Sequence, residues 1–183
     1  MRATIVFIDE SGMLMAPLVR RSWSVRGHTP VLRQRGAHYQ KVSAVAAVCI
    51  PPTRDRIALY FRLHPDANIN TERSMSFLEH LQRQLRTPIV LIWDRFQAHK
   101  GELIRQCVVP RSAHLEYLPP YAPELNPVEY LWAYLKTNPL ANDPAVDLHS
   151  LAHRARRAAH SVQRRPHLLR AFLQHTGLSL RLH

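Results

Sequence analysis

The sequence predicts an α/β fold in which a mixed sheet of about five strands carries helices on its faces. Residues 5–8 and 89–93 are apolar without alternation, which is typical of strands that are buried on both faces and often parallel. Residues 57–63 alternate between apolar and more polar side chains, as an antiparallel strand toward a sheet edge does. Apolar residues at helical spacing in 71–85 and 148–162 predict the flanking helices.

The strands of the first half are separated by turns. Residues 5–9 form the opening strand. In residues 10–36, charged residues and turn formers alternate with short apolar pieces, which favours strand and hairpin structure over helix. Residues 41–50 predict a strand of small side chains, and residues 51–56 predict a polar turn into the alternating segment. Together they indicate an antiparallel hairpin.

The middle of the chain predicts helices that alternate with short strands. Thr71 can cap the first helix, and Thr87 with Pro88 ends it. The shared apolar face of that helix carries Met75, Leu78, Leu81 and Leu85. A short helix is predicted after Asp94, with the apolar residues Leu103, Ile104, Cys107 and Val108. Residues 115–118 predict the next strand.

A stiff proline loop, residues 119–123, precedes a helix with a clear start. Each proline fixes its own φ and restrains the residue before it. Asn126 is a favoured N-cap, Pro127 suits the first helical turn, and Glu129 is the third helical residue. Glutamate at this position commonly reaches back to the cap, so capping is an alternative role for Glu129.

Carboxylates follow the two buried apolar runs. If these strands are parallel neighbours, Asp9 and Asp94 lie at one edge of the sheet on strands about 4.8 Å apart, where both can bind the same ions. With Glu129 they outline a site for two metal ions. An aspartate that closes a strand is alternatively a turn former or a helix cap. Glu10 and Glu124 rank below Glu129, because Glu10 should point to the other face and Glu124 precedes the helix.

The chain is strongly basic, with a net charge of +12 and a pI near 10.8. Such a surface attracts phosphate backbones, which makes nucleic acid the leading partner, although a solvated cationic face is the alternative. From Asp147 onward a helix is predicted, in which Arg154 and Arg157 are candidate DNA contacts. Its apolar stripe consists of Leu148, Leu151, Ala152, Ala155, Ala159 and Val162. A second helix from near Pro166 carries Leu168, Leu169, Phe172 and Leu173.

Length and composition predict a single compact domain in an intracellular protein. The chain has 183 residues, of which 46% are hydrophobic. Its two cysteines, Cys49 and Cys107, lie in apolar stretches and indicate reduced core thiols, and their number excludes a cysteine-based zinc site. The longest nearly uncharged run, residues 42–50, is too short to cross a bilayer, and no signal sequence precedes the first strand. We expect a cytoplasmic protein.

Four motifs together resemble the catalytic domain of bacterial insertion-sequence transposases related to mariner, from about residue 4 to residue 136. They are Asp9-Glu10-Ser11, then Ser22-Trp23-Ser24-Val25-Arg26-Gly27 with Pro30, then Trp93-Asp94 with His99, and Leu118-Pro119-Pro120-Tyr121-Ala122-Pro123-Glu124-Leu125-Asn126-Pro127-Val128-Glu129 with Trp132 and Lys136. Thirty-four residues, positions 95 to 128, separate the second and third acids, which is also the spacing in this family. The last motif is highly specific.

The resemblance implies an RNase H-like fold and a DDE triad of Asp9, Asp94 and Glu129. An all-carboxylate site favours hard cations, so two Mg²⁺ or Mn²⁺ ions are expected, and they would support cut-and-paste chemistry on DNA. The implied partners are double-stranded DNA, as transposon terminal inverted repeats and target DNA, and a second copy of the chain in a homodimer. His99 and Lys136 are expected to contact DNA near the triad.

The resemblance also sets the expected domain layout. Residues 1–140 would form the catalytic domain, and residues 141–183 would be basic helices that pack on it in a nucleoid-associated protein. Family members usually carry helix-turn-helix modules before this domain, yet Asp9 is almost at the start here. Either a frameshift or a partner chain supplies that module, or the gene is a truncated remnant.

Two residues depart from the family pattern. Arg95 replaces a common asparagine beside the second acid, and Ala122 replaces the usual serine of the proline loop. The Arg95 cation could bind a substrate phosphate or weaken metal uptake. One alternative to a transposase is an RNase H-like nuclease without strand transfer. Another is a DNA-binding remnant without catalysis, which Arg95 and the missing amino-terminal module make credible.

Overall fold

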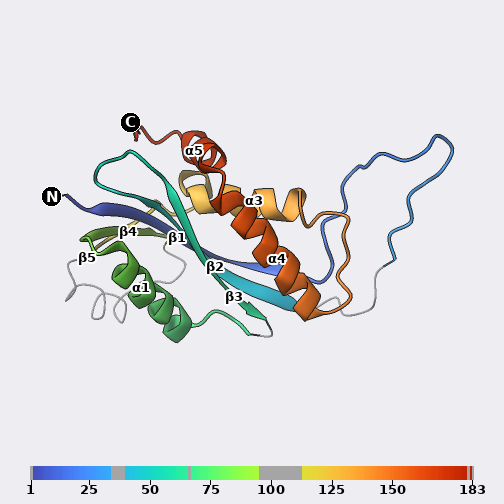
Figure 1. The fold of residues 1–183 in the computed structure, drawn as a ribbon, viewed down its shortest axis with the longest axis horizontal. Helices are drawn as coiled ribbons and strands as arrows, with labels where there is room; N and C mark the ends of the chain where they lie inside the picture. The colour runs from blue at the N-terminus through green and yellow to red at the C-terminus, as the bar shows by residue number, and fades with distance from the viewer. Residues whose placement is uncertain (1, 34–39, 66, 95–112, 181, 183) are drawn as a thin grey trace.

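The computed structural model describes residues 2–33, 40–65, 67–94, 113–180 and 182. In this part of the chain, five strands form one sheet in the order β3-β2-β1-β4-β5 (Figure 1). The strands are β1 (Thr4–Leu14), β2 (Lys41–Ile50), β3 (Ala58–Pro65), β4 (Ile89–Trp93) and β5 (Ala113–Tyr117). The helices are α1 (Thr71–Leu85), the short 3₁₀ helix η3 (Pro123–Leu125), α3 (Pro127–Thr137), α4 (Leu148–Gln163) and α5 (Pro166–His175).

The sheet is mixed, as the sequence predicts. β1 pairs with β4 in parallel, from Thr4 opposite Ile89 to Phe7 opposite Ile92. On its other side β1 pairs antiparallel with β2, and β2 pairs antiparallel with the edge strand β3. The parallel neighbours and the antiparallel hairpin of the sequence prediction are both confirmed.

The prediction that the first strand ends at Asp9 is wrong. β1 continues five residues further, to Leu14 opposite Lys41, because β2 is long enough to pair with all of it. Asp9 therefore lies in the middle of β1. Its distance from the end of β4 is nevertheless short, because β4 is the shorter strand and ends beside the centre of β1.

Residues 15–33 form an irregular arm that first lies against the body, where Met15 is buried and Leu18 and Arg20 bond to Asn142, and then projects from it (Figure 1). The predicted hairpin strands are absent from these described residues. The arm contains one tight turn, in which the His28 N–H donates to the Val25 carbonyl at 2.9 Å and Gly27 adopts a φ of 84°. Its ordered pairing with β2 ends at Met15, which donates to the Gln40 carbonyl. Beyond that point, residues 16–33 show no strand pairing with the described residues.

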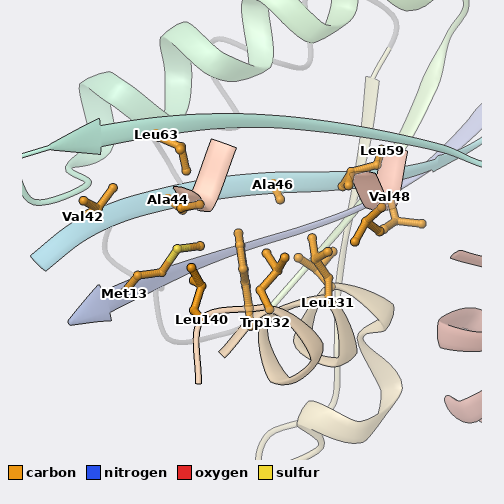
Figure 2. Packing of buried hydrophobic residues seen from close by; sticks show 14 of the residues in the cluster. Met13, Val42, Ala44, Ala46, Val48, Leu59, Leu63, Leu131, Trp132 and Leu140 are labelled. Carbon is orange, nitrogen blue, oxygen red and sulfur yellow. The ribbon is translucent and has the colours of Figure 1, made fainter. Parts of the chain in front are cut away.

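Helices cover both faces of the sheet. α1 packs on one face against a cluster that includes Ile8, Ala47 and Leu91. α3, α4 and α5 pack on the other face, where β2 presents small side chains such as Ala44 and Ala46. Figure 2 shows Trp132 and its neighbours on α3 directed at this row of β2. The small residues of β2 therefore let α3 approach the sheet closely.

The helix ends follow the sequence closely. Asn70 caps α1 by accepting from the Arg73 N–H, so the predicted cap, Thr71, is the first helical residue. α3 begins at Pro127 after the cap Asn126, as predicted. Asp147 and Ser150 form a reciprocal capping box at the start of α4. The buried residues of α4 are those of the predicted stripe, Leu148, Leu151, Ala152, Ala155, Ala159 and Val162.

Two predicted features fall in residues 95–112, which lie outside the described residues: the short helix around residues 103–108 and Cys107. Cys49 is buried in β2, and burial raises the pKa of its thiol. In the described ranges, each helix is too short or too polar to span a lipid bilayer.

Candidate active site

Asp9 is a buried carboxylate on the α3 side of the sheet, with 7% of its surface exposed. Its Oδ2 atom accepts a hydrogen bond from the Trp132 indole Nε1 at 2.8 Å. The next residue, Glu10, points to the other face and accepts from the Ser74 hydroxyl of α1 at 2.5 Å. The alternation along β1 thus directs Asp9 to the site and Glu10 away from it, as predicted.

Asp94 directly follows β4 and lies beside Asp9. Because Phe7 pairs with Ile92, continuing the parallel register by two residues brings Asp94 level with Asp9, on strands about 4.8 Å apart. The two aspartates line the same cavity, whose volume is about 390 Å³. Its wall is the proline loop, with Leu118, Pro119, Pro120, Tyr121, Ala122 and Pro123.

Glu129 reaches this cavity from the first turn of α3. The alternative role as a cap partner does not hold, because the Asn126 N–H donates to the Pro123 carbonyl at 2.9 Å instead. The Asn126 side chain caps the helix by accepting from the Val128 N–H at 3.1 Å. The side chain of Glu129 is thereby left to the cavity.

Three hydrogen bonds tie α3 to consecutive parts of β1. Asn126 Nδ2 donates to the Ile8 carbonyl at 3.1 Å, Trp132 donates to Asp9, and Lys136 Nζ donates to the Ser11 hydroxyl at 2.8 Å. The first two bonds are buried. Together they fix the helix that carries Glu129 against the strand that carries Asp9.

The three acids share one electrostatic environment. Burial raises the pKa of Asp9 to about 8, with further increases from the charges of Glu129 and Asp94, while hydrogen bonds from the Glu10 backbone and Trp132 oppose the shift. The pKa of Glu129 is also raised, mainly by partial burial; the charge of Lys136 opposes this and that of Asp94 adds to it. The carboxylates repel one another, which a bound cation would relieve.

The donor set fits a hard divalent cation. Carboxylate oxygens are the ligands that Mg²⁺ and Mn²⁺ prefer. Within the described ranges, however, no three histidine, cysteine, aspartate or glutamate side chains stand at coordinating geometry for one ion. The structure therefore brings the three acids to one cavity without arranging them as a finished ligand shell.

A family model described as DDE superfamily endonuclease matches residues 4–152. The chain belongs to the DDE superfamily endonucleases. The match covers β1 through the first turn of α4, and thus includes all three acids and the helix ties around them. A search of curated protein sequences gave no match.

Solved structures share the RNase H-like fold of this DDE domain. The Mos1 strand transfer complex aligns with a TM-score of 0.58 at 17% identity, over 97% of this chain and 56% of that chain. The Mos1 mariner paired end complex with Mg gives 0.58 at 18%, with the same coverages. The catalytic domain of Mos1 mariner transposase gives 0.52 at 15%, over 97% and 84%. The chain thus spans about 56% of the transposase chains in the two complexes.

The predicted DNA contacts of the DDE domain have different surroundings. Arg95 and His99 lie outside the described residues. Lys136 lies near the acids, bonded to Ser11. Arg154 forms an ion pair with Asp143 at 2.6 Å, whereas Arg157 is exposed and lines a separate cavity on α4. A role in DNA binding stays a prediction for all five residues.

Sequence reasoning missed the ties made by Asn126 and Trp132. It assigned Asn126 only a capping role, and Trp132 entered only as part of a motif. The sequence did contain one signal for these contacts. Spacings of three residues and then four place Glu129, Trp132 and Lys136 on one helix face. A tryptophan and a lysine beside a candidate ligand indicate a polar contact on that face.

Proposed function

We propose that this chain is the catalytic domain of a DNA transposase, which cleaves DNA at transposon ends and joins the cut ends to target DNA. The observation that carries the proposal is that Asp9, Asp94 and Glu129 line one cavity, although the chain separates them widely. Membership of the DDE endonuclease family and the fold shared with Mos1 transposase structures support it.

Asp9, Asp94 and Glu129 would hold two Mg²⁺ or Mn²⁺ ions. Structures of Mos1 have been solved with Mg and with Mn. Asp9 is the candidate shared ligand, because it lines the cavity with both other acids and lies close enough to feel both of their charges. When bound, such ions stabilise the charge that develops on the attacking and leaving oxygens of an in-line displacement.

The other residues position the DNA and the acids. The proline loop restricts one wall of the cavity, and Lys136 places a cation beside Glu129, where it can meet a phosphate. Water is the nucleophile for cleavage, and the freed DNA 3′-hydroxyl is the nucleophile for joining. Because neither displacement needs a covalent protein intermediate, Ser11 is free to serve as the acceptor for Lys136.

The proposed partners are double-stranded DNA, at the terminal inverted repeats and in the target, and a second copy of the chain. The net charge of +12 supports the first. The arm supports the second, because it exposes large apolar side chains, including Trp23 at 100%, Val31 at 79% and Val19 at 76%.

We also propose that a separately encoded or frameshift-fused helix-turn-helix module works with this chain. Residues 141–183 are proposed to be part of the catalytic unit. The proposed location is cytoplasmic and nucleoid-associated.

A strand-transfer assay with pre-cleaved transposon ends tests the proposal. The wild-type chain with Mn²⁺ should join these ends to a target plasmid, and Asp94→Asn should not. An RNase H-like nuclease would nick the plasmid in an Asp94-dependent way without joining. A remnant without catalysis would do neither, while still binding DNA.

A further inference from the structure

Helix α4 and the edge strand β3 form a cationic groove on the opposite side of β1 from β4 and β5. Two adjoining cavities, of about 420 and 280 Å³, share the lining residues Arg156, His160 and Gln163. We define the α4 groove by Arg62, Arg156, Arg157, His160, Gln163 and Arg164. Among the described residues that line the two cavities there is no aspartate or glutamate.

The basic side chains of the groove form a regular stripe along α4. Arg156, His160 and Arg164 are each four residues apart, so they lie on one face of the helix, and Arg157 is on the same side. All of them are exposed, while the opposite face is buried against β2 and β3. From residue 156 to residue 164 the stripe is about 12 Å long, which matches about three phosphates along one DNA strand.

Contacts with β3 hold the groove in shape. Gln163 Nε2 donates to the Leu59 carbonyl at 2.7 Å, and the rings of His160 and Phe61 meet edge to face with centroids 5.0 Å apart. Gln163 thus occupies a backbone acceptor of the edge strand that a peptide strand would need. This contact favours a polyanion over an added β-strand as the occupant.

The arginines of the groove differ from Arg154 in their partners. Arg154 is neutralised by Asp143 at 2.6 Å. In the described part of the chain, no carboxylate lies within ion-pair distance of Arg156, Arg157 or Arg164. Their positive charge is therefore uncompensated within the described part of the chain.

We propose that the α4 groove binds the sugar-phosphate backbone of duplex DNA. This inference rests on the proposed function for its choice of polyanion. The sheet register places Phe61 level with Asp9 through Ala46, so the groove lies at the same level along the strands as Asp9, with β3 two strand spacings or about 10 Å from β1. DNA in the groove would pass along the β3 edge of the sheet at the level of Asp9.

Duplex binding in EDTA tests the groove, with fluorescence anisotropy measured across a salt series. The variant Arg156→Gln/Arg157→Gln/Arg164→Gln is compared with Arg2→Gln/Arg54→Gln/Arg86→Gln. The second triple has the same loss of charge at exposed positions that line neither cavity. The groove triple should lose about tenfold or more in affinity, and its salt slope should fall by about two to three. The control triple should stay within about threefold.

Equal losses in the two triples would overturn the proposal, because net charge alone would then explain binding. A groove triple that binds duplex normally but loses binding to single-stranded RNA or polyglutamate would also overturn it. EDTA makes the result independent of catalysis. If the wild type nicks DNA in a way that depends on Mn²⁺ and Asp9 but the groove test fails, only the groove proposal is rejected. If the wild type never nicks DNA but the groove test succeeds, only the proposed function is rejected.

The indole of Trp132 donates a hydrogen bond to one carboxylate oxygen of the candidate metal ligand Asp9. The Nε1 to Oδ2 distance is 2.8 Å, and Trp132 is itself 3% exposed. The indole N–H only donates hydrogen bonds, so Trp132 is neither a metal ligand nor a group that titrates in the usual range. We infer that Trp132 is a positioning residue that fixes the rotation of the Asp9 carboxylate for metal binding, and this rests on the proposed function.

Trp132→Phe removes the N–H and keeps an aromatic ring in the core. Its Mn²⁺ affinity, measured by calorimetry, should fall about tenfold, as is usual when a hydrogen bond to a metal ligand is lost. The control is Tyr134→Phe, which removes a polar atom from α3 at a residue that packs against Phe172, away from Asp9. Thermal stability is measured in parallel. A Trp132→Phe protein with lower stability and unchanged Mn²⁺ affinity would show a merely structural role and overturn the inference.

Discussion

The Asp9 carboxyl lowers the stability of the metal-free fold as pH rises. Its pKa is about 8 in the folded protein against an ordinary value of 3.8, so the folded state holds the proton more tightly than the unfolded state. Below about pH 4 both states are protonated and the fold incurs no penalty. Between about pH 4 and 8 the unfolded chain ionises first, and stability falls by about 1.4 kcal/mol per pH unit at most.

Removing the Asp9 charge is therefore expected to stabilise the fold at high pH. Asp9→Asn should be more stable than the wild type at pH 8 in EDTA, and the difference should shrink toward pH 5. Urea unfolding across this range measures it, with the exposed Glu124→Gln as the control. If the unfolding free energies of the wild type and Asp9→Asn changed in parallel with pH, the pKa of Asp9 would not be raised in the folded state.

The acids themselves were predictable at the residue scale, and their supporting contacts were not. Asp9, Asp94 and Glu129 could be identified because each sits beside a recognisable local feature, a buried strand or a helix start. The bond from Trp132 to Asp9 joins residues 123 positions apart, and no local pattern determines that pairing. Sequence spacing shows only that Trp132 shares a helix face with Glu129.

At the scale of elements, Asn126 connects the start of α3 to β1. Its side chain accepts from the Val128 N–H and donates to the Ile8 carbonyl, and both bonds are buried. The cap of α1, Asn70, makes the equivalent helix bond with Arg73 in an exposed position. The same residue type therefore has one role at Asn70 and two at Asn126.

The second prediction compares these two caps. Asn70→Ala should lose about 1 kcal/mol of unfolding free energy, the usual value of an N-cap. Asn126→Ala should lose about 2–3 kcal/mol, because it also leaves the buried Ile8 carbonyl without its donor. Chemical denaturation at one pH measures both. Equal losses would mean that the tie to β1 adds nothing to stability.

Most elements followed from periodicity, and the exceptions have physical causes. The sequence predicts β2, the alternation of β3, the start of α3 and the stripe of α4. It does not predict that β1 runs on through Glu10, Ser11 and Gly12, because the partners of the two polar side chains, Ser74 and Lys136, lie on α1 and α3. Thr71 and Asn70 are both good caps, and the fold selects Asn70.

At the scale of the whole molecule, charge governs encounter with DNA. The chain has 25 lysine and arginine residues against 13 acidic residues. Several of the arginines are exposed along α4, and Lys136 lies near the acids. Such a surface releases counterions when it meets a phosphate backbone.

The third prediction concerns this release. If about six basic side chains contact phosphates, duplex affinity should fall about a thousandfold or more between about 50 and 200 mM salt. Anisotropy titrations in EDTA measure the slope, and an uncharged sugar polymer serves as the negative control. A flat response would argue against backbone contacts.

The central claim is that three distant carboxylates bind divalent ions together, and calorimetric titration with Mn²⁺ tests it most directly. The wild type should bind two ions per chain. Asp9→Asn, Asp94→Asn and Glu129→Gln should each lose binding while keeping the wild-type circular dichroism spectrum. Mn²⁺ binding that is unchanged in all three folded variants would contradict the claim.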